Sequence, residues 1–265
     1  MKEKSSAMQK FLAAPHMVWC VIFILVPLIF VLYYAFTLDG HFSFANFLSL
    51  FGNPVYFSTF VRSLCYALIA TVICLIIAYP LAYILSRMGE SRQGIMITLL
   101  MLPMWINFII RTNSMISIVK LLGFFGTPVS VILGMVYNYL PYMILPIYTV
   151  LTKIDRRYIE ASLDLGCTPF QTMCKIVLPL SVSGIISGIT MVFVPSVSTF
   201  YISTALGGNK TTLIGDMIES RFLGTNGAIN YNMGAMLSFI LMILIFLSMW
   251  VMNRFSDDDN GGVLV

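Results

Sequence analysis

Charged residues are scarce in this chain. Of its 265 residues, only 10% are Asp, Glu, Lys or Arg, whereas 59% are hydrophobic, and the mean hydropathy is +0.92. Soluble domains carry about 25% charged residues. This composition excludes a water-exposed surface for most of the chain. The lengths of the uncharged stretches are therefore informative, because one membrane span needs about 20 mostly apolar residues.

Metal-binding and catalytic side chains are missing as well. The only histidines are His16 and His41, and the five cysteines form no CxxC pair. No cluster has metal-ligand spacing, so we expect no metal site. The apolar stretches hold no Asp or Glu, and intramembrane catalysis by paired acids is therefore not expected. We predict no catalytic residue, with a membrane enzyme or scaffold as the competing class.

The chain also lacks a nucleotide-binding loop. Residues 207–211 (GGNKT) resemble only the end of such a loop, without the full G-x-x-x-x-G-K-[ST] spacing. ATP and Mg²⁺ must then bind another chain, and no cofactor is expected in this one. The net charge is +4, but no basic stripe with interleaved aromatic residues occurs, so nucleic acid is not an expected partner.

Six long apolar stretches are present, and they predict an all-α membrane protein with six transmembrane helices. They cover 17–38, the segment between Arg62 and Arg87, the segment between Arg92 and Arg111, 121–152, 176–209 and 222–253. The last three are long enough to include a loop or re-entrant turn, which Gly126-Thr127-Pro128 marks in the fourth. We expect a cytoplasmic N-terminus at 1–15, a six-span domain at 16–254 and a disordered tail at 255–265.

Lysine and arginine lie mostly on one side of these spans. One side receives Lys2, Lys4, Lys10, Arg87, Arg92, Lys153, Arg156, Arg157, Lys175 and Arg254, and the other receives Arg62, Lys120, Lys210 and Arg221. Cytoplasmic loops carry the excess of these residues. This distribution predicts a multi-pass protein of the cell membrane with both termini in the cytoplasm.

The longest connection on that side, 153–179, is predicted to be a rigid elbow of two short helices. Asp155 can cap the first helix, and Gly166 lies where a left-handed residue ends a helix. Thr168 and Gln171 have the spacing of a capping box, with Pro169 at the first helical position.

The first of these helices has two distinct faces. Tyr158, Ala161, Ser162 and Leu165 recur on one face, and Arg156, Glu160 and Asp164 recur on another. This pattern fits an amphipathic helix at the membrane interface as well as an element that docks onto a partner.

The same residues resemble the EAA loop of ABC importer permeases. The family pattern EAA-x3-G-x9-I-x-L-P is matched at every position except the second Ala, where Ser162 stands; the matching residues are Glu160, Ala161, Gly166, Ile176, Leu178 and Pro179. The resemblance implies a type I importer permease (MetI-like) fold, with a coupling helix that docks into a cytoplasmic ATPase. It implies coupling roles for Arg156, Arg157, Tyr158, Glu160, Ala161, Ser162, Asp164, Leu165 and Gly166.

Further stretches resemble the spermidine/putrescine (PotB-like) branch of this family. They are 102–107 (LPMWIN) with Arg111, 137–146 (YNYLPYMILP), 200–203, 206–210 and 213–216; Thr204-Ala205 stands where relatives often have an acid. The resemblance implies polyamine uptake with a second, PotC-like permease, a PotA-like ATPase dimer and an external PotD-like binding protein in a bacterial inner membrane. Iron, another organic cation or an anion is the alternative solute.

The expected solute path combines charged and aromatic side chains. Arg111 lies at a span edge, where it either snorkels to the interface or serves a gating or structural role. Asp216 and Glu219 would share a helix face that attracts a cation, or form a solvated face that Arg221 screens. Aromatic faces attract cations but also pack at interfaces. The path candidates are Trp105, Asn107, Arg111, Tyr137, Tyr201, Asp216 and Glu219.

Overall fold

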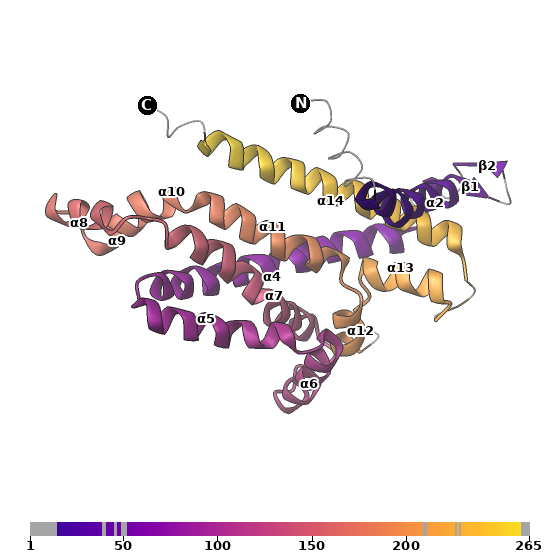
Figure 1. Ribbon diagram of the computed structural model, residues 1–265. Coiled ribbons are helices and arrows are strands. Elements are labelled where there is room, and N and C mark those ends of the chain that lie inside the picture. Colours follow the sequence, from indigo (N-terminus) through magenta and orange to yellow (C-terminus); the bar gives the residue numbers. More distant parts are fainter. Residues whose placement is uncertain are drawn as a thin grey trace, which may run out of the picture. The chain divides into compact units, whose positions relative to one another are not determined.

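The structure, a computed structural model, describes residues 15–38, 41–44, 47–48, 52–208, 211–225, 227 and 229–260, without the side chains of 90, 253 and 255–260. Within this part the chain is helical, apart from an antiparallel hairpin of β1 (Thr37–Leu38) and β2 (His41–Phe42) (Figure 1). Residues 1–14 of the expected N-terminal segment 1–15 and residues 261–265 of the expected tail lie outside it.

The chain divides into two units, of which the first comprises Met1–Phe57 and Met217–Ile243. It begins with one apolar helix over Pro15–Ala35, which contains the π-helical turn η1 (Val21–Leu25) and α2 (Val26–Ala35). In the most apolar stretch of this helix no residue is buried, as expected for a helix that faces lipid. After α2, rings of Phe36, Phe42, Phe44, Phe47 and Phe239 pack together.

The second unit comprises Ser58–Asp216 and Leu244–Val265 and contains the elements that position the candidate sites. Its core lies around α7 (Pro128–Leu151), which packs extensively along α11 (Val182–Ser198). Gly184 and Gly188 permit this close approach, because a Cβ at either position would lie 3.0 Å or less from α7, against Pro146 O or Met143 Sδ. These two glycines of the fifth apolar stretch therefore pack inside this chain.

The expected spans are present. Four helices are long and apolar enough to cross a membrane: Pro15–Ala35, α4 (Pro54–Ser86), α7 and the Tyr231–Met252 part of α14 (Tyr231–Asn260). Two bent helix pairs bring the total to as many as six. The turn predicted at Gly126-Thr127-Pro128 is confirmed, since the Thr127 side chain accepts a hydrogen bond from Ser130 N and Pro128 is the first residue of α7.

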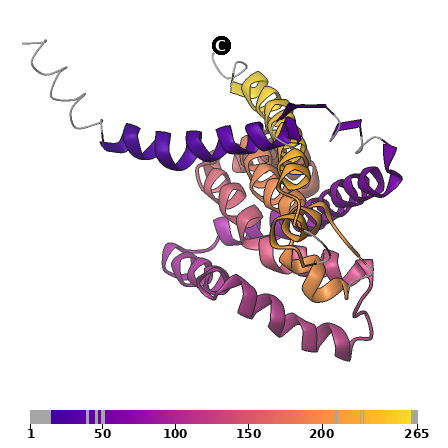
Figure 2. The same cartoon turned by 90° about the vertical axis from the view of Figure 1, so that its right-hand side faces the viewer.

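The third span differs from its prediction. It does not end near Arg111 but breaks, with a bend of 94°, between α5 (Glu90–Trp105) and α6 (Phe108–Leu121) (Figure 2). The peptide is extended at Ile106 and Asn107, and the Asn107 side chain accepts a hydrogen bond from Ile109 N at 2.9 Å. A helix cap inside an apolar run starts a new helix, which hydropathy does not register.

The fifth segment is also subdivided. Before it lies α9 (Pro169–Thr172), and the π-helical turn η2 (Met173–Val177) leads into it. The segment itself contains α10 (Leu178–Leu180), then α11 after a bend of 68°, and a separate α12 (Tyr201–Gly207). The remaining elements are α8 (Arg156–Asp164) and α13 (Ile214–Leu223). At the C-terminus α14 continues to Asn260, into the segment for which a disordered tail was expected.

Candidate functional site

The first helix of the elbow, α8, has defined ends. Asp155 Oδ1 accepts a hydrogen bond from Arg157 N at 3.0 Å, which caps the start. At the other end Gly166 has a φ of +84°, Gly166 N donates to Leu163 O at 2.9 Å, and Cys167 N donates to Ser162 O at 3.0 Å. This paired bonding is a Schellman motif, so the left-handed glycine predicted from the sequence is confirmed.

The second helix, α9, starts with the predicted capping box. Gln171 Oε1 accepts from Thr168 N at 2.9 Å, and Thr168 Oγ1 accepts from Gln171 N at 3.3 Å. Pro169 occupies the first helical turn. The chain direction is therefore defined on both sides of Gly166 by local hydrogen bonds.

A pair of buried hydroxyl groups joins the two helices. Ser162 Oγ lies 2.8 Å from Thr172 Oγ1, and one of these hydroxyls donates to the other. The accepting hydroxyl donates its own proton to a backbone carbonyl, which is Ile159 O for Ser162 and Thr168 O for Thr172. Ser162 is only 3% exposed, so it faces α9 and does not belong to the exposed face with Tyr158 and Leu165. An alanine would fill this position without the hydroxyl bond. Ser162 thus stabilises the elbow, and the coupling role that the family resemblance implies for it stays a prediction.

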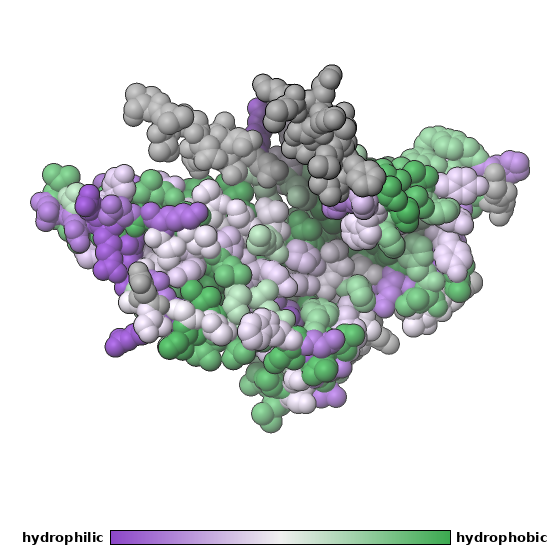
Figure 3. All heavy atoms as spheres, in the orientation of Figure 1, coloured by the Kyte–Doolittle hydropathy of each residue, from purple (hydrophilic) through white to green (hydrophobic). Residues whose placement is uncertain are grey.

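The outer surface of the elbow exposes large apolar side chains among charged ones. Leu165 is 86% exposed and Phe170 is 77% exposed, and Tyr158 is also exposed. The exposed residues around them are mostly charged and comprise Arg156, Arg157, Glu160, Ala161 and Asp164. Figure 3 shows hydrophilic residues gathered over α8 and α9. Phe170 was missed by the sequence analysis, although an apolar residue directly after the Pro169 helix start was its signal.

Arg111 is buried inside the second unit and does not snorkel. It is only 6% exposed, its Nε donates to Asn138 Oδ1 at 2.7 Å, and its Nη1 donates to Pro103 O at 2.6 Å. Asn138 in turn donates to Gly134 O at 2.9 Å and to Thr112 Oγ1 at 3.3 Å. Arg111 therefore bonds a carbonyl of the last turn of α5 and supports the break before α6, which is the structural role left open by the sequence.

The other path candidates of the second unit are distributed around the same break. Asn107 caps α6, and Tyr201 OH donates to Asn113 Oδ1 at 2.8 Å. The Arg111 Cζ lies 6.0 Å from the Tyr137 ring centroid. Trp105 ends α5 and is 76% exposed. Trp105, Tyr137 and Tyr201 thus lie on elements that meet at one bend, whereas Asn107 and Arg111 hold that bend together.

Asp216 accepts hydrogen bonds at the start of α13. Its Oδ1 accepts from Ser203 Oγ at 2.7 Å and from Thr204 Oγ1 at 2.9 Å, and its Oδ2 accepts from Leu213 N at 2.7 Å. The carboxylate therefore joins α12 to α13 and caps a helix N-terminus. Glu219 lies one turn later on the same helix and is half-buried. Arg221, in the first unit, donates to Tyr56 OH at 3.0 Å.

No group of three His, Cys, Asp or Glu side chains in the described ranges is arranged to hold a metal ion. The expectation that this chain holds no metal stays a prediction.

The chain matches the family of binding-protein-dependent transport system inner membrane components over residues 6–258. It belongs to this family. Its relatives include the spermidine/putrescine transport system permease protein PotB of Haemophilus influenzae, which is 35% identical over 96% of both chains. PotB of Escherichia coli K12 is 32% identical over 90% of this chain and 94% of its own length.

Solved structures support the same fold for this permease. A bacterial alginate ABC transporter chain aligns with a TM-score of 0.78 at 14% identity, over 96% of this chain and 95% of that one. A chain of the MetNI methionine ABC transporter aligns with a TM-score of 0.60 at 19% identity, over 76% of this chain and 94% of that one. The predicted type I importer (MetI-like) fold is confirmed, and the chain is a permease subunit of an ABC importer.

Proposed function

We propose that this permease imports polyamines of the spermidine and putrescine class and forms half of the translocation path. The observation that carries the proposal is the similarity to PotB of Haemophilus influenzae, which extends over 96% of both chains at 35% identity. The stretches that resemble this branch, including the bend residues Trp105 and Arg111, lie inside the aligned region. Iron, another organic cation or an anion is the competing solute.

The proposed assembly has four further components. A second, PotC-like permease supplies the other half of the path, a PotA-like ATPase dimer binds ATP and Mg²⁺, and a PotD-like protein delivers the solute outside. This chain holds no cofactor and catalyses no bond chemistry. The excess of Lys and Arg around the elbow supports a cytoplasmic location for the elbow and both termini in a bacterial inner membrane.

The elbow is proposed to transmit the movement of the ATPase to the spans. Tyr158, Leu165 and Phe170 are exposed apolar anchors that suit a cleft on a partner, with Arg157, Glu160 and Asp164 as the polar rim. The Schellman motif, the capping box and the Ser162 to Thr172 bond stiffen the elbow. A stiff element transmits a displacement, whereas a flexible loop would absorb it.

Asp216 is the proposed source of negative charge on the path. Thr204-Ala205 stands where spermidine/putrescine permeases often carry an acid, and this departure argues against direct cation binding at these two residues. Asp216, which accepts from Thr204 Oγ1 at 2.9 Å, is the nearby carboxylate. Trp105, Tyr137 and Tyr201 are the proposed aromatic wall, because aromatic faces attract alkylammonium groups. Glu219 adds a second carboxylate to the same helix.

The test is solute-stimulated ATP hydrolysis by the complete importer in lipid nanodiscs. Spermidine and putrescine, each with the binding protein, should raise the hydrolysis rate, whereas amino acids, ferric iron and inorganic anions should not. Stimulation by one of those solutes and not by polyamines would reject the substrate. The permease should also lose its ATPase during purification when residues 156–175 are replaced by a flexible linker. Retention of the ATPase would favour a scaffold or enzyme whose EAA-like loop is accidental.

A further inference from the structure

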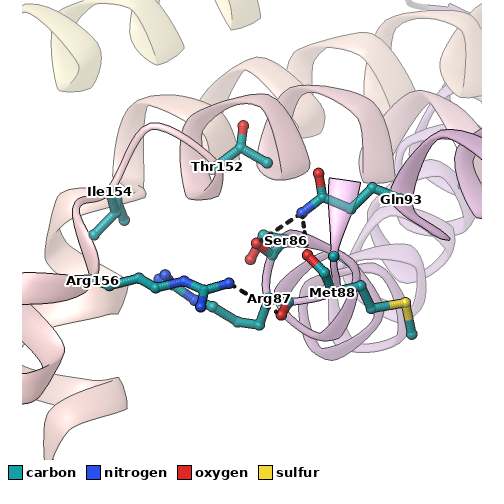
Figure 4. Close-up of a pocket in the computed structure, with 8 residues that line it drawn as sticks. Ser86, Arg87, Met88, Gln93, Thr152, Ile154 and Arg156 are labelled. Atoms are coloured by element: carbon teal, nitrogen blue, oxygen red, sulfur yellow. Dashed lines mark hydrogen bonds between the residues drawn. The ribbon is translucent and has the colours of Figure 1, made fainter. Parts of the chain in front are cut away.

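A polar pocket of about 410 Å³ lies at the base of the elbow (Figure 4). It is lined by Arg87, which directly follows α4, by Gln93 of the first turn of α5, by Thr152, which directly follows α7, and by Arg156 at the start of α8. Both α4 and α7 are membrane-spanning helices, and they end at Ser86 and Leu151. The pocket therefore lies where two spans leave the membrane.

Arg87 has guanidinium atoms without a partner. Its Nε and Nη2 are buried and make no hydrogen bond in the structure, while its Cζ lies 5.5 Å from the Tyr83 ring centroid. Buried polar atoms are nearly always hydrogen-bonded, and an unsatisfied charged group is costly. Arg156 reaches the same site from α8, where its Nη2 makes only a long 3.4 Å bond to Arg87 O (Figure 4).

Within the described part of the chain, no nearby polar group neutralises these two arginines. Gln93 Nε2 donates to Ser86 O and Met88 O, and its Oε1 accepts from Tyr148 OH. Glu160 lines a smaller adjoining pocket with Arg87 and Arg156, but no ion pair joins it to either of them among the described side chains. The carboxylate of Asp155 caps α8. Among the described side chains that line this pocket, Arg87 and Arg156 are therefore the only charged ones, and both are positive.

We propose that this pocket binds a phosphate group, from the headgroup of an anionic phospholipid or from free phosphate. Arginine forks bind phosphate oxygens in a bidentate manner, which suits the unpartnered edge of Arg87. Basic pockets between spans on the cytoplasmic side bind anionic lipid headgroups. The volume is within the range of pockets that hold small ligands.

The bound phosphate would link the end of a span to the elbow. Arg156 is the first residue of α8, and Arg87 directly follows α4. A phosphate shared by both guanidinium groups holds the coupling helix against the spans, so anionic lipid strengthens the transmission of movement. This role is independent of the transported solute.

The experiment uses the intact importer in nanodiscs of phosphatidylcholine, with or without phosphatidylglycerol. Native mass spectrometry measures retained phosphatidylglycerol, and a second arm measures binding of radiolabelled inorganic phosphate in pure phosphatidylcholine. The test variant combines Arg87→Gln with Arg156→Gln. Arg92→Gln is the matched control, because Arg92 is exposed in the first turn of α5 and does not line the pocket. Arg87→Lys keeps the charge without the planar fork.

We expect the double variant to bind phosphatidylglycerol about tenfold more weakly, which corresponds to about 1.4 kcal/mol, and Arg92→Gln to match the wild type. The affinity of Arg87→Lys for phosphatidylglycerol should lie between those of the double variant and the wild type. If the double variant does not assemble, Arg87→Lys is compared with the wild type in its place. Loss of inorganic phosphate binding in the double variant, with lipid retention unchanged, would identify free phosphate as the source.

Equal retention of lipid and equal binding of phosphate in all variants would overturn the proposal. It would also be overturned if the double variant lost its ATPase in phosphate-free phosphatidylcholine. In that case an acidic side chain of the ATPase occupies the pocket.

Discussion

Hydrogen bonds of single polar side chains stabilise the bends between helices in this apolar chain. Arg111 and Asn138 form hydrogen bonds across the break between α5 and α6, and Asp216 joins α12 to α13. Each bond satisfies a polar group that would otherwise be unpaired in an environment with little water. At such positions the loss of one side chain affects stability before it affects transport.

Arg111→Met should therefore destabilise the permease. The substitution keeps much of the apolar stem but removes the charged hydrogen bonds to Asn138 Oδ1 and Pro103 O, with an expected cost of about 3 kcal/mol. Thermal unfolding of the purified protein in nanodiscs measures this loss. Lys120→Met, which removes an exposed cation from the same helix, is the control. Equal unfolding temperatures for the two variants would contradict the structural role of Arg111.

Two substitutions, Asp216→Asn and Glu219→Gln, distinguish the helix-capping role of Asp216 from the attraction of a cation by the two carboxylates. The amide group cannot accept from both Leu213 N and the two hydroxyl groups, so the variant should lose about 1 kcal/mol of stability as well as spermidine uptake. Glu219→Gln removes the same charge one turn away and should leave the unfolding temperature nearly unchanged. Thermal unfolding measures the capping role, and spermidine uptake into proteoliposomes measures the attraction of the cation. Unchanged uptake in the double variant would reject both carboxylates as path residues.

The elbow shows how short elements become rigid without a large core. α8 and α9 are too short to be stable alone, and their order comes from caps, the Schellman motif and one hydroxyl pair. The position between them, Gly166, has φ +84° and open space around the place of a Cβ. Backbone strain is therefore the reason for glycine here, and steric crowding is not.

Gly166→Val should uncouple the ATPase. A β-branched residue in the left-handed region costs about 1–2 kcal/mol or more, so the end of α8 changes direction and the exposed anchors move. Gly166→Asn, which tolerates this region better, should retain most of the activity. The measurement is co-purification of the ATPase and solute-stimulated hydrolysis. Gly94→Val is the control, because Gly94 also has open space but lies inside α5. Normal coupling in Gly166→Val would show that the elbow tolerates another geometry.

For the whole molecule, hydropathy and charge predict topology as well as fold. The predicted alternation of spans puts the elbow and both termini on the side that is rich in Lys and Arg. This predicted topology would let a cytoplasmic ATPase reach the proposed coupling face.

A cysteine that lies in the elbow provides a test of this topology. In a variant that retains only Cys174, which is exposed, a membrane-impermeant maleimide should label the permease in inverted vesicles and not in right-side-out vesicles. The vesicles should contain the two permeases without ATPase, so that nothing covers the elbow. Labelling in right-side-out vesicles would show that the elbow faces the outside, opposite to the predicted topology, and would reject the coupling role. A cysteine introduced at Ser5 should give the same sidedness.

Local patterns were sufficient for the spans, the turn before α7 and the caps of the elbow, because each depends on residues close together along the chain. The bend of the third span, the burial of Arg111 and the inward position of Ser162 could not be predicted in this way. They depend on contacts between separate helices, such as Arg111 with Asn138 and Ser162 with Thr172. Hydropathy reports how apolar a segment is, but only the packing of segments against one another selects the partner of each polar group.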